Sequence, residues 1–155
     1  MRKSSLITLG ILAILMVFFA GYGCAVLTTS KNISSGANVI TTVNLSVYDS
    51  EVATVELTFI DWQNILPTQV KTKEIWVQND ADISMSISVT TKDWLPSYAQ
   101  DSITFTYAEG KGWSGGAYPT LNPHQKAQLI FTLTANDNPP SGSFSFTIVI
   151  SGMAG

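Results

Sequence analysis

Hydrophobic and polar residues alternate with a period of two along most of the chain after residue 38. From Ile83 to Val89, for example, every second side chain is apolar and the residues between are all serines. Such alternation is typical of strands with one face on a core and the other in water. It predicts seven strands, at about 39–48, 52–60, 71–79, 82–91, 102–107, 127–135 and 143–151.

Short clusters of turn-forming residues separate these predicted strands, and no segment after residue 30 shows a 3.6-residue helical repeat. About seven short antiparallel strands with regularly spaced turns are typical of an antiparallel β-sandwich of the immunoglobulin-like or jelly-roll type. The sequence therefore predicts an all-β domain over residues 38–155, with enough inward apolar side chains for a core of its own.

The N-terminal segment has a different pattern. Residues 4–30 contain no charge, and residues 6–27 are nearly all apolar and follow Arg2 and Lys3. This run is longer than the h-region of a signal peptide, about 7–15 residues, and long enough to span a bilayer, which takes about 20. Residues 1–27 are thus predicted to form a hydrophobic helix, either a cleaved signal peptide or a retained transmembrane anchor. In both cases the basic flank stays inside and the remainder is exported.

Residues 28–37, TTSKNISSGA, are small and polar, which predicts a flexible linker before the domain. Two glycosylation triplets begin at Asn32 and Asn44, the candidate glycan acceptors. The protein is expected at the extracellular face of the membrane or in an extracellular filament.

Charge and cysteine content narrow the function classes. Beyond residue 30 the chain has six lysines against 11 acidic residues, a net charge of −5. An acidic domain lacks the basic footprint of nucleic-acid binding. The single cysteine, Cys24, lies in the apolar segment, so no disulfide stabilises the predicted domain and no thiol is available there for catalysis.

Candidate catalytic residues are few. The single histidine, His124, lies in a predicted turn, and the sequence contains no HExxH, GxSxG, Walker or GxGxxG motif. Acidic residues flank two predicted turns, at 49 and 51 and at 80 and 82, but neither pair comes with the further oxygen ligands that calcium requires. We therefore predict a non-catalytic protein without cofactor or metal ion.

Aromatic residues supply the alternative of a carbohydrate-binding or adhesive module. Trp76 lies between the inward residues Ile75 and Val77 and is predicted to face outward, whereas Trp113 and Tyr118 lie in the glycine-rich segment 109–119. Exposed planar rings stack on sugars, and tryptophan and tyrosine are also enriched at protein contacts. These three residues are the candidate binding aromatics, for a glycan or another surface partner.

Two pairs of motifs are predicted to be structural. Asp61-Trp62 and Asp93-Trp94 each precede a proline, and we interpret them as strand ends where the ring closes the core and the carboxylate caps a turn. Residues 66–77 and 121–133 share a leucine and a proline followed two residues later by glutamine. Thr68 resists the positive φ that a type II turn would need at that position.

Four segments carry a resemblance to a known family: IDWQNILPTQVKTKEIWVQN (60–79), VTTKDWLP (89–96), LNPHQ (121–125) and FSFTIVISG (144–152). With them the chain resembles small exported β-domains found mainly in archaea, similar to the camelysin and biofilm-matrix fibre-subunit family and to archaeal sandwich-type pilus or thread subunits. The resemblance covers about residues 40–152. Gln63 and Thr68 stand where the family favours glycine.

The resemblance implies self-association by donor-strand exchange, in which an N-terminal segment completes the sheet of a neighbouring subunit. The suitable donor is residues 36–48, with alternate side chains to fill a groove: Val39, Val43, Leu45 and Val47. The alternative is that this segment pairs within its own domain as the first strand.

Overall fold

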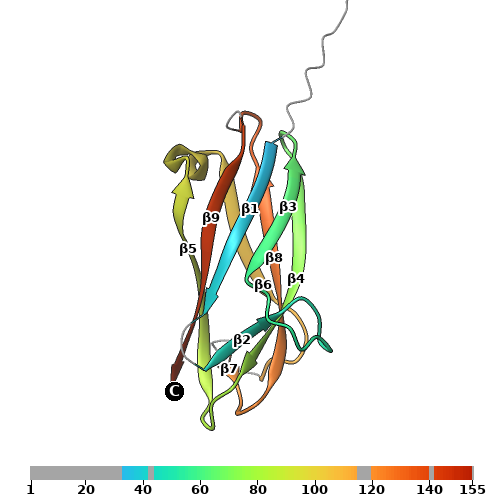
Figure 1. Cartoon of the computed structure of the whole chain (residues 1–155), viewed down its shortest axis with the longest axis vertical. Coiled ribbons are helices and arrows are strands. Elements are labelled where there is room, and N and C mark those ends of the chain that lie inside the picture. Colours follow the sequence, from blue (N-terminus) through green and yellow to red (C-terminus); the bar gives the residue numbers. More distant parts are fainter. Residues whose placement is uncertain (1–32, 42–43, 115–119, 140–141, 155) are drawn as a thin grey trace, which may run out of the picture. The chain divides into compact units, whose positions relative to one another are not determined.

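The computed structural model describes residues 33–41, 44–114, 120–139 and 142–154 (Figure 1). The predicted signal or anchor segment 1–27 lies outside these residues, as do Asn32, Val43 and Tyr118. Within the described ranges, no helix is long and apolar enough to cross a membrane.

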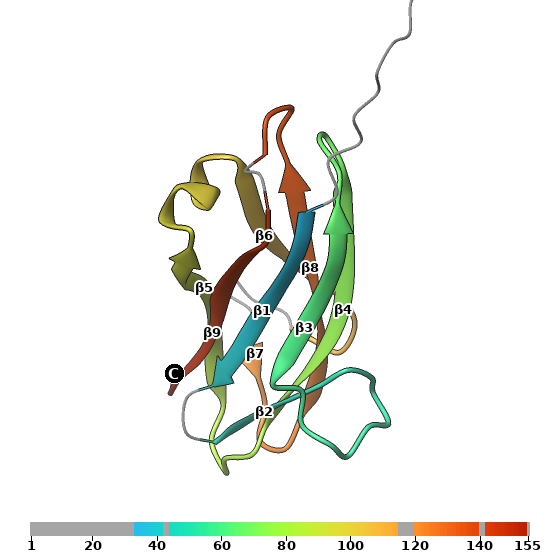
Figure 2. The ribbon, with the colours of Figure 1, turned by 45° about the horizontal axis from the view of Figure 1, so that its top comes forward.

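The described residues form two β-sheets that pack face to face, which confirms the predicted β-sandwich (Figures 1 and 2). One sheet has the order β3-β1-β9-β5-β7 and the other the order β2-β4-β8-β6. The strands are β1 (Ile33–Thr41), β2 (Leu45–Tyr48), β3 (Phe59–Ile65), β4 (Val70–Asn79), β5 (Met85–Leu95), β6 (Ile103–Glu109), β7 (Thr120–Leu121), β8 (Lys126–Ala135) and β9 (Phe144–Ala154). A short 3-10 helix, η1 (Ser97–Asp101), joins β5 to β6.

The core between the sheets follows from the alternation. In β8 and β9, every second side chain from Ala127 to Ala135 and from Phe144 to Ile150 is buried. These two strands lie in the middle of the two sheets and contribute the largest share of the core, because both of their neighbours shield them from water.

Two of the seven predicted strands and the predicted linker differ from the structure in ways that matter. The predicted strand 39–48 is two strands, since β1 ends at Thr41 and β2 begins at Leu45 in the other sheet. The predicted linker 28–37 is wrong in its second half, because β1 begins at Ile33. The third is the predicted strand 52–60.

Residues 52–58 form a loop, and the alternation of Val55, Leu57 and Phe59 does not mark a buried face. Val55 is 79% exposed and Phe59 is 51% exposed. Strand β3 starts at Phe59 with the opposite phase, so that Ile60 and Trp62 point into the core. Period-two alternation indicates that a segment can form a strand, but it does not determine which of the two faces of that strand is buried.

Both Asp-Trp motifs form β-bulges. Asp61-Trp62 lies in the middle of β3, not at a strand end as predicted, whereas Asp93-Trp94 lies at the end of β5, as predicted. In β3 the register against β1 shifts at Trp62, and Gln63 has a φ of 57°. In β5 the register against β9 shifts between Lys92 and Leu95, and Asp93 has a φ of 55°. An extra residue in a bulge re-aims the neighbouring side chain, and here both tryptophan rings turn toward the core.

The two carboxylates differ in their roles. The Asp61 side chain accepts a hydrogen bond from the Gln63 amide at 2.7 Å and so caps the bulge, as expected. The Asp93 carboxylate pairs with the neighbouring Lys92 ammonium group, at 3.7 Å in an exposed pair. Trp94 stacks on Phe146 with ring centroids 4.2 Å apart, which ties the second bulge to the core.

The similarity between segments 66–77 and 121–133 is a similarity of turns. Leu66-Pro67-Thr68-Gln69 and Asn122-Pro123-His124-Gln125 each have proline second and a residue with positive φ third, 61° at Thr68 and 56° at His124. Both are closed by a hydrogen bond from the fourth amide to the first carbonyl, at 3.1 Å in each. Both are therefore type II turns, despite the resistance of threonine to that conformation.

Candidate functional site

The first strand, β1, lies inside its own sheet rather than at its edge (Figure 2). It pairs antiparallel with β3 on one side and parallel with β9 on the other, with Ala37 opposite Phe146 and Val39 opposite Ile148. A central position in a sheet gives β1 two rows of backbone hydrogen bonds. The slot between β3 and β9 is the place where a donated strand would sit.

The side chains that fill this slot are small. Ser35, Ala37 and Val39 point inward and are buried, and the Ser35 hydroxyl donates to the Gln63 carbonyl at 2.9 Å, next to the bulge. A slot that takes a serine, an alanine and a valine selects against larger side chains, because protein cores are close-packed.

On the outer face of β1, the ring of Phe59 lies over Gly36. A β-carbon added to Gly36 would lie 2.4 Å from the tip of this ring. Phe59 therefore covers the glycine backbone of β1 from the water side. This contact explains an exposed phenylalanine at the start of β3.

The predicted donor residues divide between the two sheets. Val39 lies in the slot, but Leu45 and Val47 belong to β2, which pairs antiparallel with the end of β4. Val43 lies outside the described residues. A single donated strand from 36 to 48 is therefore wrong, and the segment that could be exchanged as one strand is β1 alone.

Trp76 does not face solvent as predicted. It does lie on the outer face of β4, between Tyr48 of β2 and Gln128 of β8, but only 8% of it is exposed. The segment that follows β2 is held beside it. The Lys126 ammonium group lies 3.9 Å from the centre of the Tyr48 ring and donates to the carbonyls of Glu51 and Ala53 at 2.9 and 3.2 Å.

Of the other two predicted binding aromatics, the structure describes Trp113. Trp113 is half-buried against the core, and its indole N–H donates to the Gln128 carbonyl at 2.6 Å. Tyr118 lies outside the described residues. Stacking on a sugar needs an exposed ring face, and Trp76, at 8% exposed, does not present one.

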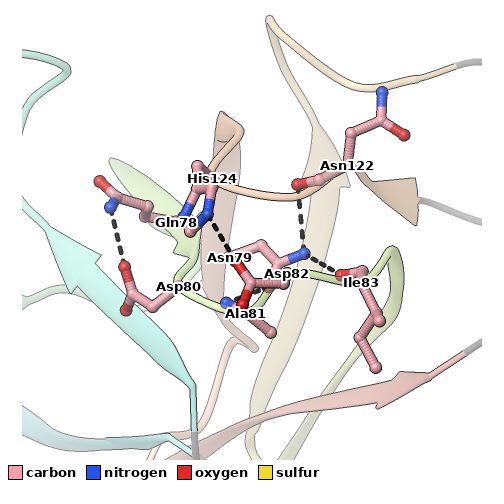
Figure 3. A network of polar contacts seen from close by, with 8 residues as sticks. All are labelled: Gln78, Asn79, Asp80, Ala81, Asp82, Ile83, Asn122 and His124. Carbon is pink, nitrogen blue, oxygen red and sulfur yellow. Dashed lines mark hydrogen bonds and ion pairs between the residues drawn. The ribbon is translucent and has the colours of Figure 1, made fainter.

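A buried polar network joins the turn after β4 to the segment before β8 (Figure 3). Asn79 is fully buried, and its amide group donates to the carbonyls of Ile83, Leu121 and Asn122 at 2.7, 3.2 and 3.1 Å. Its side-chain oxygen accepts from the Ala81 amide at 2.9 Å. Asn79 thus satisfies four backbone groups at once, which identifies the network as structural.

His124 and Asp82, whose residue types also occur in catalytic sites, lie at the rim of this network. His124 is exposed, with Nε2 at 3.0 Å from the carboxylate of Asp82, which is also exposed. The pair links the two turns across the surface (Figure 3). Among the described residues, no group of three or more histidine, cysteine, aspartate or glutamate side chains could hold a metal ion.

Of the two candidate glycan acceptors, the structure describes Asn44. It is exposed in the turn before β2 with a φ of 65°. Ser46 of the same triplet is buried, with its hydroxyl 2.6 Å from the Asp80 carboxylate and 3.2 Å from that of Glu56. A transferase that needs the whole triplet would therefore have to act before this strand is paired.

No family model matches the chain, and no curated protein matches it in sequence.

Two features of the site were not predicted from the sequence. Residues 33–36 looked like a linker because serine and glycine dominate them, although Ser35 and Ala37 share the parity of a buried face. Asn79 shares the inward parity of Ile75 and Val77, and that parity was the available signal for a buried asparagine.

Proposed function

We propose that the protein is a non-catalytic structural protein of the cell surface. In this proposal it is held in the membrane by its N-terminal segment or assembles into extracellular filaments, with β1 as the donated strand. The observation that carries the proposal is the position of β1, the first described strand, in a slot between β3, the next strand of its sheet, and β9, the last described strand.

The arrangement of the other strands supports a separable β1. From β3 to β9, consecutive strands alternate between the two sheets, an order that favours the jelly-roll type of sandwich. Two segments correspond within it, β3-turn-β4-β5 and β7-turn-β8-β9, each with one of the type II turns. In the second segment β7 pairs directly with β5, whereas β1 separates β3 from β9. β1 is therefore an additional strand, inserted between β3 and β9 of the two corresponding segments.

The connection after β1 also supports donation. The chain crosses from one sheet to the other between Thr41 and Leu45, and β2 remains paired with β4. β1 can therefore leave its slot without taking β2 along, and a β1 strand from a neighbouring copy can make the same backbone hydrogen bonds.

A pair of introduced cysteines distinguishes pairing within one chain from donation between chains. Asn38 and Phe59 lie directly opposite each other in the antiparallel pair of β1 and β3, at a spacing that suits a disulfide. We expect the full chain with Cys24→Ser, Asn38→Cys and Phe59→Cys, purified under reducing conditions and then oxidised after assembly, to give a ladder of disulfide-linked multimers. Electron microscopy of the same sample should show fibres.

The control is the same protein oxidised before assembly. An intramolecular disulfide then holds β1 in its own slot, so neither ladder nor fibres should form until reductant is added. The contrary outcome is a gel that shows only monomer in every condition although all cysteines are oxidised. That result would show that β1 pairs within its own chain and would overturn strand donation.

A further inference from the structure

Strand β6 forms one edge of its sheet and is unusual in that no described residue protects it there. Its sequence, ITFTYAE, contains no proline, glycine or lysine, and its single charge is the last residue, Glu109. No strand among the described residues pairs with β6 on the side away from β8. Natural edge strands are normally blunted by lysine, proline or a bulge, since an open edge accepts another strand.

The backbone groups that face outward can be assigned. The amide of Gly110 donates to Gln128 and the carbonyl of Ser102 accepts from Asn136, both across the β6–β8 pair. Because the direction alternates along an antiparallel strand, Thr104, Thr106 and Ala108 bond to β8. The N–H and C=O groups of Ile103, Phe105, Tyr107 and Glu109 consequently point away from the sheet.

The opposite opening of the sandwich, between β3 and β4, is protected. Lys71 lies on the inner face of β4, and its ammonium group donates to the Trp62 carbonyl of β3 at 2.8 Å. Lys73 lines the hollow of about 260 Å³ beside it, together with Asp61 and Glu74. Inward-pointing charges at an edge oppose the addition of another strand.

The opening beside β6 has a different lining. A hollow of about 360 Å³ lies between β5 and β6, lined by Val89, Thr90, Thr91, Phe105, Thr106 and Tyr107, without a charged side chain. Tyr107 is 39% exposed although it lies on the inner side of its strand. An added strand would find open backbone groups and partly exposed aromatic rings at the same place.

The sequence of β6 fits its own copy in one antiparallel register. Centred on Thr106, the pairing uses all seven residues and places Phe105 opposite Tyr107 of the second copy. Glu109 then faces Ile103 of the second copy, so like charges do not meet, whereas a register centred on Phe105 would bring Glu109 against Asp101. Aromatic pairs across neighbouring strands are favourable.

We propose that β6 is a docking edge for the β6 strand of a second copy of this chain, antiparallel and centred on Thr106. The joined sheet would have eight strands. Its outer face would continue the row of Thr72, Thr132 and Thr106, which the strand register already sets side by side. This contact does not involve β1, so it goes beyond the strand donation proposed above and fails or stands independently of it.

A seven-residue edge is smaller than the roughly 20–30 residues a side of a stable interface. The contact by itself is therefore weak and depends on concentration. Copies gathered on a membrane or along a filament would pair far more fully, because tethering raises their effective concentration.

The test is cysteine cross-linking of the full chain in detergent micelles, with Cys24→Ser so that the introduced cysteine is the sole thiol. In the proposed register Thr106 faces Thr106 of the second copy at about 4.5 Å between α-carbons, as in a non-hydrogen-bonded antiparallel pair. We expect Thr106→Cys to form a disulfide-linked dimer under mild oxidation, more so at higher protein concentration.

Thr132→Cys is the matched control. It lies opposite Thr106 on the same face but one strand further from the edge, so two copies would hold it about 14 Å apart, beyond disulfide reach. Its dimer yield should be lower than that of Thr106→Cys by a factor of about ten or more. Equal yields from the two variants, or no dimer from Thr106→Cys at any concentration, would overturn the proposal.

Two variants block the edge. Tyr107→Pro removes an N–H that points away from β8, so the pairing with β8 stays intact, and Tyr107→Lys places a charge at the edge. Each should abolish the Thr106→Cys dimer while circular dichroism and the melting temperature show a folded protein. A dimer that persists in folded Tyr107→Lys would contradict the docking edge.

Discussion

Asn79 is the last residue of β4 on its inner face, in line with Ile75 and Val77, and its side chain is fully buried. A buried amide is tolerated only when its donors and its acceptor are satisfied. Here backbone groups supply the partners: those of Ala81, Ile83 and Asn122, drawn in Figure 3, and the carbonyl of Leu121 at the end of β7. One asparagine thus fixes the ends of β4 and β7 against each other.

Replacing this asparagine should destabilise the fold. Asn79→Ala leaves buried carbonyls without a donor and should lower the free energy of unfolding by about 2–4 kcal/mol. Asn79→Asp should cost more, because an oxygen then replaces the NH₂ group that faces three carbonyls. Urea denaturation measures both.

Gln78→Ala, at the neighbouring position, is the control for the two Asn79 variants. The Gln78 side chain bonds to the exposed Asp80 carboxylate at 2.8 Å on the outer side, so its loss should change the stability by less than about 1 kcal/mol. Equal losses from positions 78 and 79 would contradict the assigned role of Asn79.

Strands β4 and β8 each begin at a type II turn, and the two turns lie at opposite ends of the antiparallel pair. In each turn the glutamine side chain accepts from the first amide, Leu66 at 2.8 Å and Asn122 at 2.7 Å. The glutamine carbonyl then accepts from the end of the other strand, from Ala135 and from Asn79, at 3.0 Å in both cases. Glutamine therefore stabilises the turn and aligns the pair.

Thr68 carries the conformational cost of its turn. A β-branched residue with a φ of 61° is strained by about 1–2 kcal/mol, and glycine is not. We expect Thr68→Gly to raise the free energy of unfolding by about 1 kcal/mol after the greater flexibility of glycine in the unfolded chain is subtracted. Thermal unfolding followed by circular dichroism measures the change.

The same substitution at Thr72 has the opposite sign. Thr72 lies in the middle of β4, where glycine loses strand propensity and chain entropy. Thr72→Gly should therefore lower the melting temperature. A decrease for both variants would show that the turn at Thr68 is not strained.

At the scale of the whole sandwich, the two lateral openings differ in chemistry. The opening between β3 and β4 contains lysines on the inner face of β4, and the one between β5 and β6 contains threonines and aromatic rings. Inward lysines are among the devices by which proteins prevent pairing between sheet edges. The difference predicts one closed side and one side open to association.

Removing the lysines should open the closed side. Lys71→Thr with Lys73→Thr eliminates the contact with the Trp62 carbonyl and both charges, so we expect faster aggregation at equal protein concentration, measured by light scattering. Lys92→Thr with Lys111→Thr removes the same net charge elsewhere and should have little effect. An equal increase in both proteins would assign the effect to net charge alone.

The sequence determined the sandwich, because strands with period-two alternation and turn residues between them can bury one face only by packing two sheets together. It also identified the two turns and both Asp-Trp motifs as structural, although not the bulges that Trp62 and Trp94 occupy. Strands and turns depend on local residue types, so they can be predicted without knowing which segments pack against each other.

The tertiary structure alone decided which strands are neighbours and which faces are covered. Val55 and Phe59 follow the same alternation as buried residues but remain exposed, whereas Trp76 lies on the outer face of β4 and is buried. The same holds for β1, whose serine and glycine residues resemble a linker until β3 and β9 lie on both sides of it. Burial depends on contacts between segments far apart in the chain, and a local pattern does not contain those contacts.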